Sequence, residues 1–173
     1  MSFDIAFKLV RGTGIAAILA STAFLASCQV RPLYSESSGA AGKLATVGFS
    51  EAGGRVEQEV RNRLIFIASR GAGEPENPEY KVEFSARSNV ISTLLVASSD
   101  ESLAGRATVS VDYTLKSTKD GHVIKAGNRY ATALVDFPAQ EFAKQRAIRD
   151  AENRAARQAA EFVGADIAAA LGR

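Results

Sequence analysis

The sequence predicts one small α+β domain, a two-layer sandwich in which two helices pack on one face of a mostly antiparallel, four-stranded sheet. Three observations predict it. An apolar stripe of helical period follows a short apolar run, the next segments alternate apolar and polar residues, and the C-terminal part is rich in helix formers. Strands and helices segregated in the order β-α-β-β-β-α are typical of α+β folds.

The first strand and the first helix are predicted between residues 44 and 70. Leu44–Phe49 is a short apolar run, and Gly53 and Gly54 end it. Arg55–Arg70 carries apolar residues at every third or fourth position, which places them on one face of a helix. These residues are Val56, Val60, Leu64 and Ile67. The prolines and glycines of Gly71–Pro78 predict a loop.

The next two strands are predicted because the apolar period changes to that of a strand. Tyr80–Val90 alternates apolar and polar residues, and Leu94–Val96 is expected to continue this strand. The polar, acidic stretch Ser98–Leu103 is predicted to be a turn. Ala107–Leu115 has the clearest alternation in the chain and is predicted to be the next strand.

The last strand, Val123–Val135, is predicted to return beside Ala107–Leu115. Asp120 and Gly121 suit the tight hairpin turn between the two strands, because such a turn needs a residue that accepts a positive φ. A bulge is expected near Gly127.

The last helix is predicted from Pro138 to Leu171, where good helix formers predominate. Its apolar face carries Ile148, Ala151, Ala155, Ala159 and Phe162, and its opposite face carries Arg146, Arg149, Arg154 and Arg157. The alanines would let the helix lie close to the sheet. The arginine face is either solvated or a surface for a partner. A break is expected at Gly164, because an unbroken helix would place Asp166 on the apolar side.

Residues 1–27 are predicted to be a cleaved signal peptide. Lys8 and Arg11 form a short basic region, and the uncharged, largely apolar stretch Gly14–Leu25 follows. As a helix this stretch would be about 18 Å long at ~1.5 Å per residue. The hydrocarbon core of a bilayer is about 30 Å thick, so a secretory signal is favoured over a membrane span.

The segment Leu25-Ala26-Ser27-Cys28 resembles the lipobox of bacterial lipoproteins. Cys28 is the only cysteine of the chain, so it cannot form an intrachain disulfide, and lipid attachment is the predicted use of its thiol. The alternative is a plain signal peptide with a stray cysteine, or a short membrane anchor. Gln29 in place of Asp favours the outer membrane, by resemblance to the enterobacterial sorting rule.

The mature chain is predicted to have two parts. Residues 28–43 form the lipidated N-terminus and a flexible tether, because Ser35–Gly42 is polar, small and rich in glycine. Residues 44–173 form a single periplasmic α+β domain, since they are enough for one core and too few for two domains.

Composition and side-chain chemistry predict a protein that is not an enzyme. The net charge of +2 is too small to indicate nucleic-acid binding. His122 is the only histidine and is expected to be solvated beside the hairpin glycine, which excludes a histidine metal cluster. Asp100 and Glu101 could ligate a cation, but adjacent carboxylates in a polar turn are more often only solvated. We predict no metal and no cofactor apart from the covalent lipid on Cys28.

Basic residues mark the ends of the predicted strands. They are Arg106, Lys116, Lys119, Lys125 and Arg129. If the hairpin forms, some of these cations crowd one end of the sheet, where they would suit the phosphates of a lipid head group. Lysines on a sheet edge also protect against aggregation, and the sequence favours neither interpretation.

Four segments together resemble the LptE family of lipopolysaccharide (LPS) assembly lipoproteins, in its alphaproteobacterial form. They are Cys28–Tyr34 (CQVRPLY), Arg55–Leu64 (RVEQEVRNRL), Gly105–Thr108 (GRAT) with the strand that ends at Leu115, and Asp150–Ala155 (DAENRA). The resemblance covers essentially the whole mature chain and depends on the order and spacing of the four segments.

The resemblance implies a role in LPS export. Such proteins plug the large LptD-like β-barrel that delivers LPS to the outer leaflet, support the assembly of that barrel and bind LPS. The predicted two-layer α+β fold is that of the family. By resemblance, LPS contacts would fall on basic positions near strand ends, here Arg106 and Lys119 or Lys125.

Two other functions remain open. An auxiliary outer-membrane lipoprotein of another lipid-trafficking system would lack a stoichiometric β-barrel partner. A periplasmic hydrolase that uses carboxylates would need a deep pocket with paired acids.

Overall fold

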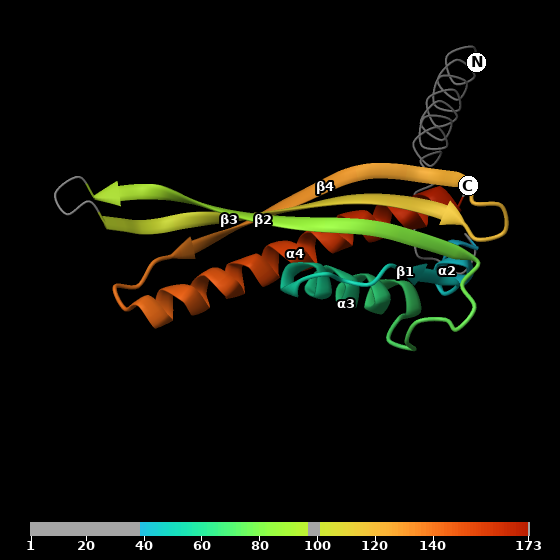
Figure 1. Ribbon diagram of the computed structural model, residues 1–173, viewed down its shortest axis with the longest axis horizontal. Coiled ribbons are helices and arrows are strands. Elements are labelled where there is room, and N and C mark those ends of the chain that lie inside the picture. Colours follow the sequence, from blue (N-terminus) through green and yellow to red (C-terminus); the bar gives the residue numbers. More distant parts are fainter. Residues whose placement is uncertain (1–38, 97–100, 173) are drawn as a thin grey trace, which may run out of the picture. The chain divides into compact units, whose positions relative to one another are not determined.

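The computed structural model describes residues 39–96 and 101–172. Their elements are α2 (Ala40–Leu44), β1 (Val47–Phe49), α3 (Arg55–Ser69), β2 (Tyr80–Val96), β3 (Glu101–Ser117), β4 (Val123–Asp136) and α4 (Glu141–Leu171). The strands form one sheet in the order β1-β2-β3-β4, in which β1 and β2 are parallel and the other pairs are antiparallel. Helices α3 and α4 pack on one face of this sheet (Figure 1), which confirms the predicted α+β class.

The start of the described part differs from the prediction. The predicted signal peptide and Cys28 lie outside the described residues, but the end of the predicted tether is helical, because α2 occupies Ala40–Leu44. The predicted strand Leu44–Phe49 is therefore shortened to β1. Burial of Ala40 and Leu44 stabilises a helix that is too short to form alone. Lys43 Nζ donates to the Leu171 carbonyl at 2.8 Å and so caps the end of α4.

Helix α3 confirms the helix predicted at Arg55–Arg70. Its buried side chains are Val60, Leu64 and Ala68. The carboxylate of Glu57 ties the start of the helix to the sheet, because it accepts the N–H of Gly53 at 2.7 Å and the N–H of Ala86 at 3.1 Å. Arg70 ends the helix in the left-handed conformation, with φ 53°.

The strands follow the predicted alternation. Strand β2 continues past Ser92 to Val96, as predicted, with register shifts near its end. Strand β3 begins at Glu101, so the turn predicted at Ser98–Leu103 is shorter than expected, and residues 97–100 lie outside the described residues. Gly121 has φ 71°, which confirms the glycine requirement of the β3–β4 turn.

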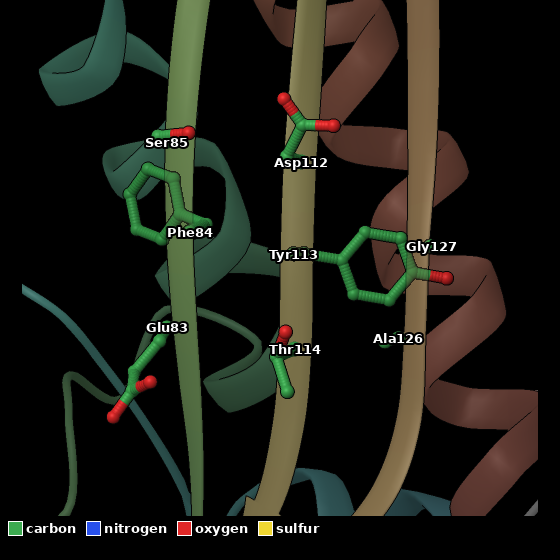
Figure 2. Close-up of a pocket in the computed structure, with 8 residues that line it drawn as sticks. All are labelled: Glu83, Phe84, Ser85, Asp112, Tyr113, Thr114, Ala126 and Gly127. Atoms are coloured by element: carbon green, nitrogen blue, oxygen red, sulfur yellow. The ribbon is translucent and has the colours of Figure 1, made fainter.

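The bulge predicted near Gly127 is wrong. The register shift between β3 and β4 falls at Leu115 and Lys116, and Gly127 pairs in register with Tyr113. A Cβ at Gly127 would lie 2.9 Å from the Tyr113 hydroxyl oxygen. The glycine is therefore needed for the close approach of the Tyr113 ring, which reaches across β4 at this position (Figure 2).

The break predicted at Gly164 is also wrong, because α4 is continuous from Glu141 to Leu171. Gly164 serves the packing of the two helices instead. A Cβ there would lie 3.2 Å from Ile67 Cγ2 of α3. Asp166 does face the sheet, and its carboxylate is bound there by two side chains described below.

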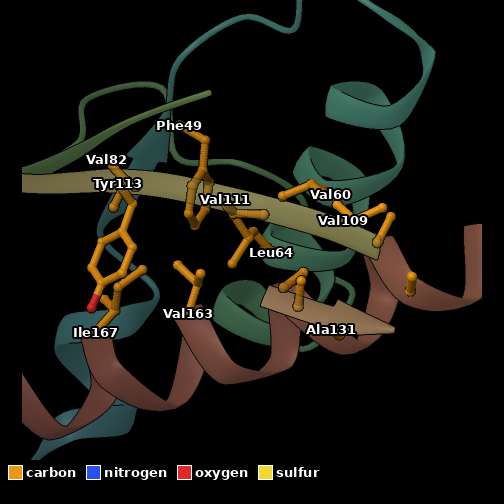
Figure 3. Close-up of a cluster of buried hydrophobic side chains, with 14 of the residues drawn as sticks. Phe49, Val60, Leu64, Val82, Val109, Val111, Tyr113, Ala131, Val163 and Ile167 are labelled. Atoms are coloured by element: carbon orange, nitrogen blue, oxygen red, sulfur yellow. The ribbon is translucent and has the colours of Figure 1, made fainter. Parts of the chain in front are cut away.

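One apolar core lies between the sheet and the helices (Figure 3). Strand β3 contributes the alternate residues Ala107, Val109, Val111, Tyr113 and Leu115. Helix α4 contributes mostly small residues: Ala151, Ala155, Ala156, Ala159, Ala160, Val163, Ile167 and Ala168. The alanines let the helix lie close to the sheet, as predicted, whereas Phe162 of the predicted apolar face is 44% exposed. Within the described residues, no helix is long and apolar enough to cross a membrane.

Candidate functional site

The three cations predicted to contact LPS lie towards different ends of the sheet. Arg106 is on β3, Lys119 is in the β3–β4 turn, and Lys125 of β4 pairs in register with Leu115. Arg106 and Leu115 are nine residues apart on β3, which is about 30 Å at ~3.3 Å per residue. The two lysines therefore lie near each other, and Arg106 belongs to a separate region.

Arg106 lies on the sheet face that no described helix covers, between two apolar side chains. Its register partners are Ile91 of β2 and Leu134 of β4, which are 39% and 73% exposed. Leu103 and Phe142 are 47% and 89% exposed at the same end of the sheet and at the start of α4. A cation among exposed apolar side chains suits an amphiphile with an anionic head group.

Gly105, beside Arg106, lets an aromatic ring cover the inner side of β3. A Cβ at Gly105 would lie 2.9 Å from the Ile91 carbonyl oxygen and closer still to the Phe137 ring. Lys144 Nζ lies 5.0 Å from the centre of that ring, within cation–π range. The glycine of the GRAT segment is thus explained by packing at the junction of β3, β4 and α4.

The lysine end of the sheet contains a small cavity and an exposed turn. Lys125 lines a cavity of about 330 Å³ between β4 and α4, together with Ile124, Asp166, Ala169 and Ala170. His122 is exposed in the turn, as predicted. Its backbone N–H donates to Asp120 Oδ1 at 3.1 Å, and its carbonyl accepts the N–H of Ser117 at 2.9 Å.

A polar cluster of Tyr113, Arg129 and Asp166 joins β3, β4 and α4 at the border of the core. The Tyr113 hydroxyl donates to Asp166 Oδ2 at 2.6 Å. Arg129 donates two hydrogen bonds to the same carboxylate, from Nε to Oδ2 at 2.7 Å and from Nη2 to Oδ1 at 2.8 Å. Bidentate pairing of this kind fixes geometry as well as charge, so the cluster holds β4 against the far half of α4.

The cluster shifts the ionisation of its members. The hydrogen bonds from Arg129, and then that from Tyr113, hold the pKa of Asp166 below its ordinary value, although partial burial acts the other way. Burial, and then the hydrogen bond to Asp166, raises the pKa of the Tyr113 hydroxyl. The bound state of the cluster therefore has an ionised Asp166 and a neutral Tyr113.

The stability of the domain should depend on pH through Asp166. Because its pKa is lowered in the fold, its contribution is present above the ordinary aspartate pKa of about 3.9 and is lost as the pH falls below it. We expect Asp166→Asn to cost roughly 1.5–3 kcal/mol at pH 7. Urea unfolding of the two proteins between pH 2.5 and 7 tests this, and a difference that does not shrink as the pH falls towards 2.5 would contradict it.

Around Asp112 and Lys116, the uncovered face of the sheet is polar and internally paired. Arg87 pairs with Asp112 at 2.7 Å, and Lys116 pairs with Glu83 at 2.5 Å. Asn128 Nδ2 also donates to Asp112, at 2.7 Å. A shallow, open depression in this face is lined by Glu83, Phe84, Ser85, Asp112, Tyr113, Thr114, Ala126 and Gly127 (Figure 2). No deep pocket with paired acids, such as the hydrolase hypothesis requires, is among these features of the described residues.

Metal-ligating side chains do not gather in the described part of the chain. No group of three or more His, Cys, Asp and Glu residues there could hold a metal ion.

The Tyr113–Arg129–Asp166 cluster was missed by sequence reasoning, although one signal pointed to it. Asp166 falls on the sheet side of an unbroken helix, and a carboxylate in such a place needs partners. Arg129 was assigned to the basic group at the hairpin instead. Its inward direction becomes clear once it is paired in register with Val111, a core residue of β3.

This α+β sandwich is the fold of a class of bacterial lipoproteins. The chain resembles the crystal structure of a protein of Caulobacter crescentus CB15 described as a lipoprotein, with a TM-score of 0.63, 24% identity, and coverage of 78% of this chain and 96% of that one. It also resembles rare lipoprotein B of Shewanella oneidensis, with a TM-score of 0.54, 11% identity, and coverage of 71% and 92%. These likenesses show a shared fold.

The chain belongs to the LptE family of lipopolysaccharide-assembly proteins, whose model matches residues 42–165. This match confirms the resemblance seen in the sequence. No curated protein matches the chain by sequence.

Proposed function

We propose that this protein is a non-enzymatic, lipid-anchored component of the outer-membrane LPS translocon, and that it plugs the lumen of the translocon's β-barrel. Membership of the LPS-assembly family is the observation that carries the proposal. Cys28 supplies the anchor, through acyl chains attached to its thiol after removal of residues 1–27.

The uncovered face of the sheet supports a place inside a barrel. The lumen of an outer-membrane barrel is polar, so a protein that fills it needs hydrogen-bonding groups and few unpaired charges on its surface. On this face the ion pairs Arg87–Asp112 and Lys116–Glu83 neutralise four side chains. Hydroxyl and amide groups of β3 and β4 lie on the same face: Thr108, Ser110, Thr114, Asn128 and Thr132.

The surroundings of Arg106 support a contact with LPS. A phosphate of the lipid would pair with the guanidinium, and acyl chains would cover Ile91 and Leu134 on either side. Lys119 and Lys125 offer charge about 30 Å away, at the end of the sheet where Val123 is 45% exposed. Arg106 differs in having an exposed apolar register partner on each side, Ile91 and Leu134, so of the three predicted contacts it has the setting that best suits the whole amphiphile.

Purification of the tagged protein from envelopes in mild detergent tests the plug. We expect one large β-barrel to co-purify in a one-to-one ratio, and mass spectrometry identifies it. Recovery of the lipidated protein without any barrel would refute the proposal and would favour an auxiliary lipoprotein of another lipid-trafficking system.

Charge reversal at Arg106 tests the LPS contact. We expect Arg106→Glu to weaken binding to immobilised LPS by roughly tenfold or more, because a cation is lost and an anion is placed opposite a phosphate. The control is Lys119→Glu, which makes the same charge change at the other end of the sheet and should weaken binding less. Equal losses in the two variants would mean that only net charge matters.

A further inference from the structure

The two edges of the sheet are treated differently by the rest of the fold. Beyond the short strand β1, side chains occupy the edge of β2 at Phe84 and Ala86. The N–H of Phe84 donates to Ser50 Oγ at 3.3 Å, and that of Ala86 donates to Glu57 Oε1 at 3.1 Å. The β1–α3 connection and α3 thus occupy backbone groups that would otherwise be free to pair with another strand.

The other edge, formed by β4, is open. The N–H of Phe137 points to β3, where it bonds the Leu103 carbonyl at 2.8 Å, whereas the Leu134 carbonyl points away and accepts from Arg154 at 2.9 Å. Backbone groups alternate in direction along a strand, so the even-numbered residues of β4 face outwards. These residues are Ala126, Asn128, Tyr130 and Thr132, and their backbone groups bond no other described residue.

Strand β4 has few of the features that usually prevent an edge strand from pairing with another strand. A charge that points inwards from an edge strand hinders pairing, but the guanidinium of Arg129 is drawn onto Asp166 of α4 by two hydrogen bonds. Gly127 has no side chain to obstruct a neighbour. β4 also pairs with β3 in unbroken register from Lys125 to Asp136, so the edge is long and regular.

Helix α4 presents apolar side chains beside the open edge. Phe162, Ala165 and Ala169 follow Arg154 at helical spacing, so they share the side of α4 that faces this edge. Phe162 is 44% exposed, and Ala169 lines the cavity of about 330 Å³ that also contains Lys125. Side chains of an added strand would meet an apolar surface here, with a cation at one end.

We propose that an extended segment of a partner polypeptide adds to the sheet along β4, from Ala126 to Thr132. Its backbone pairs with the outward N–H and C=O groups. Apolar side chains at alternate positions contact Phe162 and Ala169, and an acidic side chain pairs with Lys125. The inference rests on the proposed function only in placing that partner in the outer-membrane complex.

Amide hydrogen exchange of the full, lipidated chain tests the proposal without any substitution. Residue-resolved rates are compared for the chain with its co-purified partner and for the chain stripped of it in the same detergent. We expect the amides of Asn128, Tyr130 and Thr132 to exchange roughly tenfold or more slowly in the complex. Equal rates in the two samples would overturn the proposal.

Proline substitution provides a second test, because Thr132→Pro removes an outward N–H and leaves the bonds to β3 intact. We expect recovery of the partner to fall several-fold. The matched control is Ser92→Pro, which removes an outward N–H from the opposite edge and should leave recovery unchanged. Undiminished recovery with Thr132→Pro, or equal loss in both variants, would overturn the proposal.

Photo-crosslinking in intact envelopes separates this inference from the proposed function. A photoreactive residue at position 132 should form an adduct with another polypeptide. An adduct with a protein other than a barrel refutes the plug but supports strand addition. The absence of an adduct, or an adduct with the mass of two copies of this chain, overturns strand addition by a partner.

Discussion

Replacement of Cys28 by alanine is expected to move the protein from the membrane fraction to the soluble periplasmic fraction. Each buried CH₂ of an acyl chain contributes about 0.8 kcal/mol, so one chain of about fifteen such groups contributes on the order of 12 kcal/mol of membrane affinity. After loss of the chains, only protein held by the proposed barrel should remain in the membrane fraction. Fractionation of envelopes followed by immunoblotting measures the effect.

The lipid itself can be detected in the same strains. Wild type should incorporate radioactive palmitate and Cys28→Ala should not, while Ser35→Ala, in the predicted tether, should behave as wild type. Wild-type protein without label, or a mature N-terminus at any residue other than Cys28, would contradict the anchor and with it the proposed location.

Truncation of Leu64 is expected to give the largest loss of folding stability. Its side chain is 1% exposed in the core, where it lies near Val60 and Val111 (Figure 3). Leu64→Ala removes buried methyl groups and leaves a cavity, which costs about 3 kcal/mol. The melting temperature should fall by roughly 10 °C, as measured by circular dichroism on the soluble domain without residues 1–28.

Phe66 provides the control for this truncation on the same helix. Its ring is 56% exposed, and it contacts Arg63 at 5.5 Å from the ring centre. Phe66→Ala removes more atoms than Leu64→Ala but should cost less than about 1 kcal/mol. Equal losses in the two variants would mean that α3 does not present its Leu64 side to the sheet.

The elements that could be predicted from sequence are those with local signals. The stripe that contains Val60 and Leu64 gives α3, and the alternation from Ala107 to Leu115 gives β3, because each pattern lies within one segment. Helix α2 escaped prediction since its stability comes from burial of Ala40 and Leu44 in the assembled fold and not from its own length.

The features that could not be predicted depend on contacts between distant segments. A helix break was predicted because Asp166 would otherwise lie on the apolar side of the helix. The residues that bind its carboxylate, Tyr113 and Arg129, lie 53 and 37 residues away in the chain, so the sequence did not reveal them. Some of the cations near the strand ends were expected to crowd one end of the sheet, and the register of β3 with β4 places Lys125 at the hairpin end, far from Arg106. Spacing along the sequence cannot supply that register.

The absence of a break in α4 also has a mechanical consequence. Its 31 residues form a rod about 46 Å long at ~1.5 Å per residue. Phe142 lies at one end, and the Leu171 carbonyl at the other end is bound by Lys43. A hinge at Gly164 would let the two halves of α4 move separately. The continuous helix instead moves as one rod, so a displacement at the Lys43 end is transmitted to Phe142.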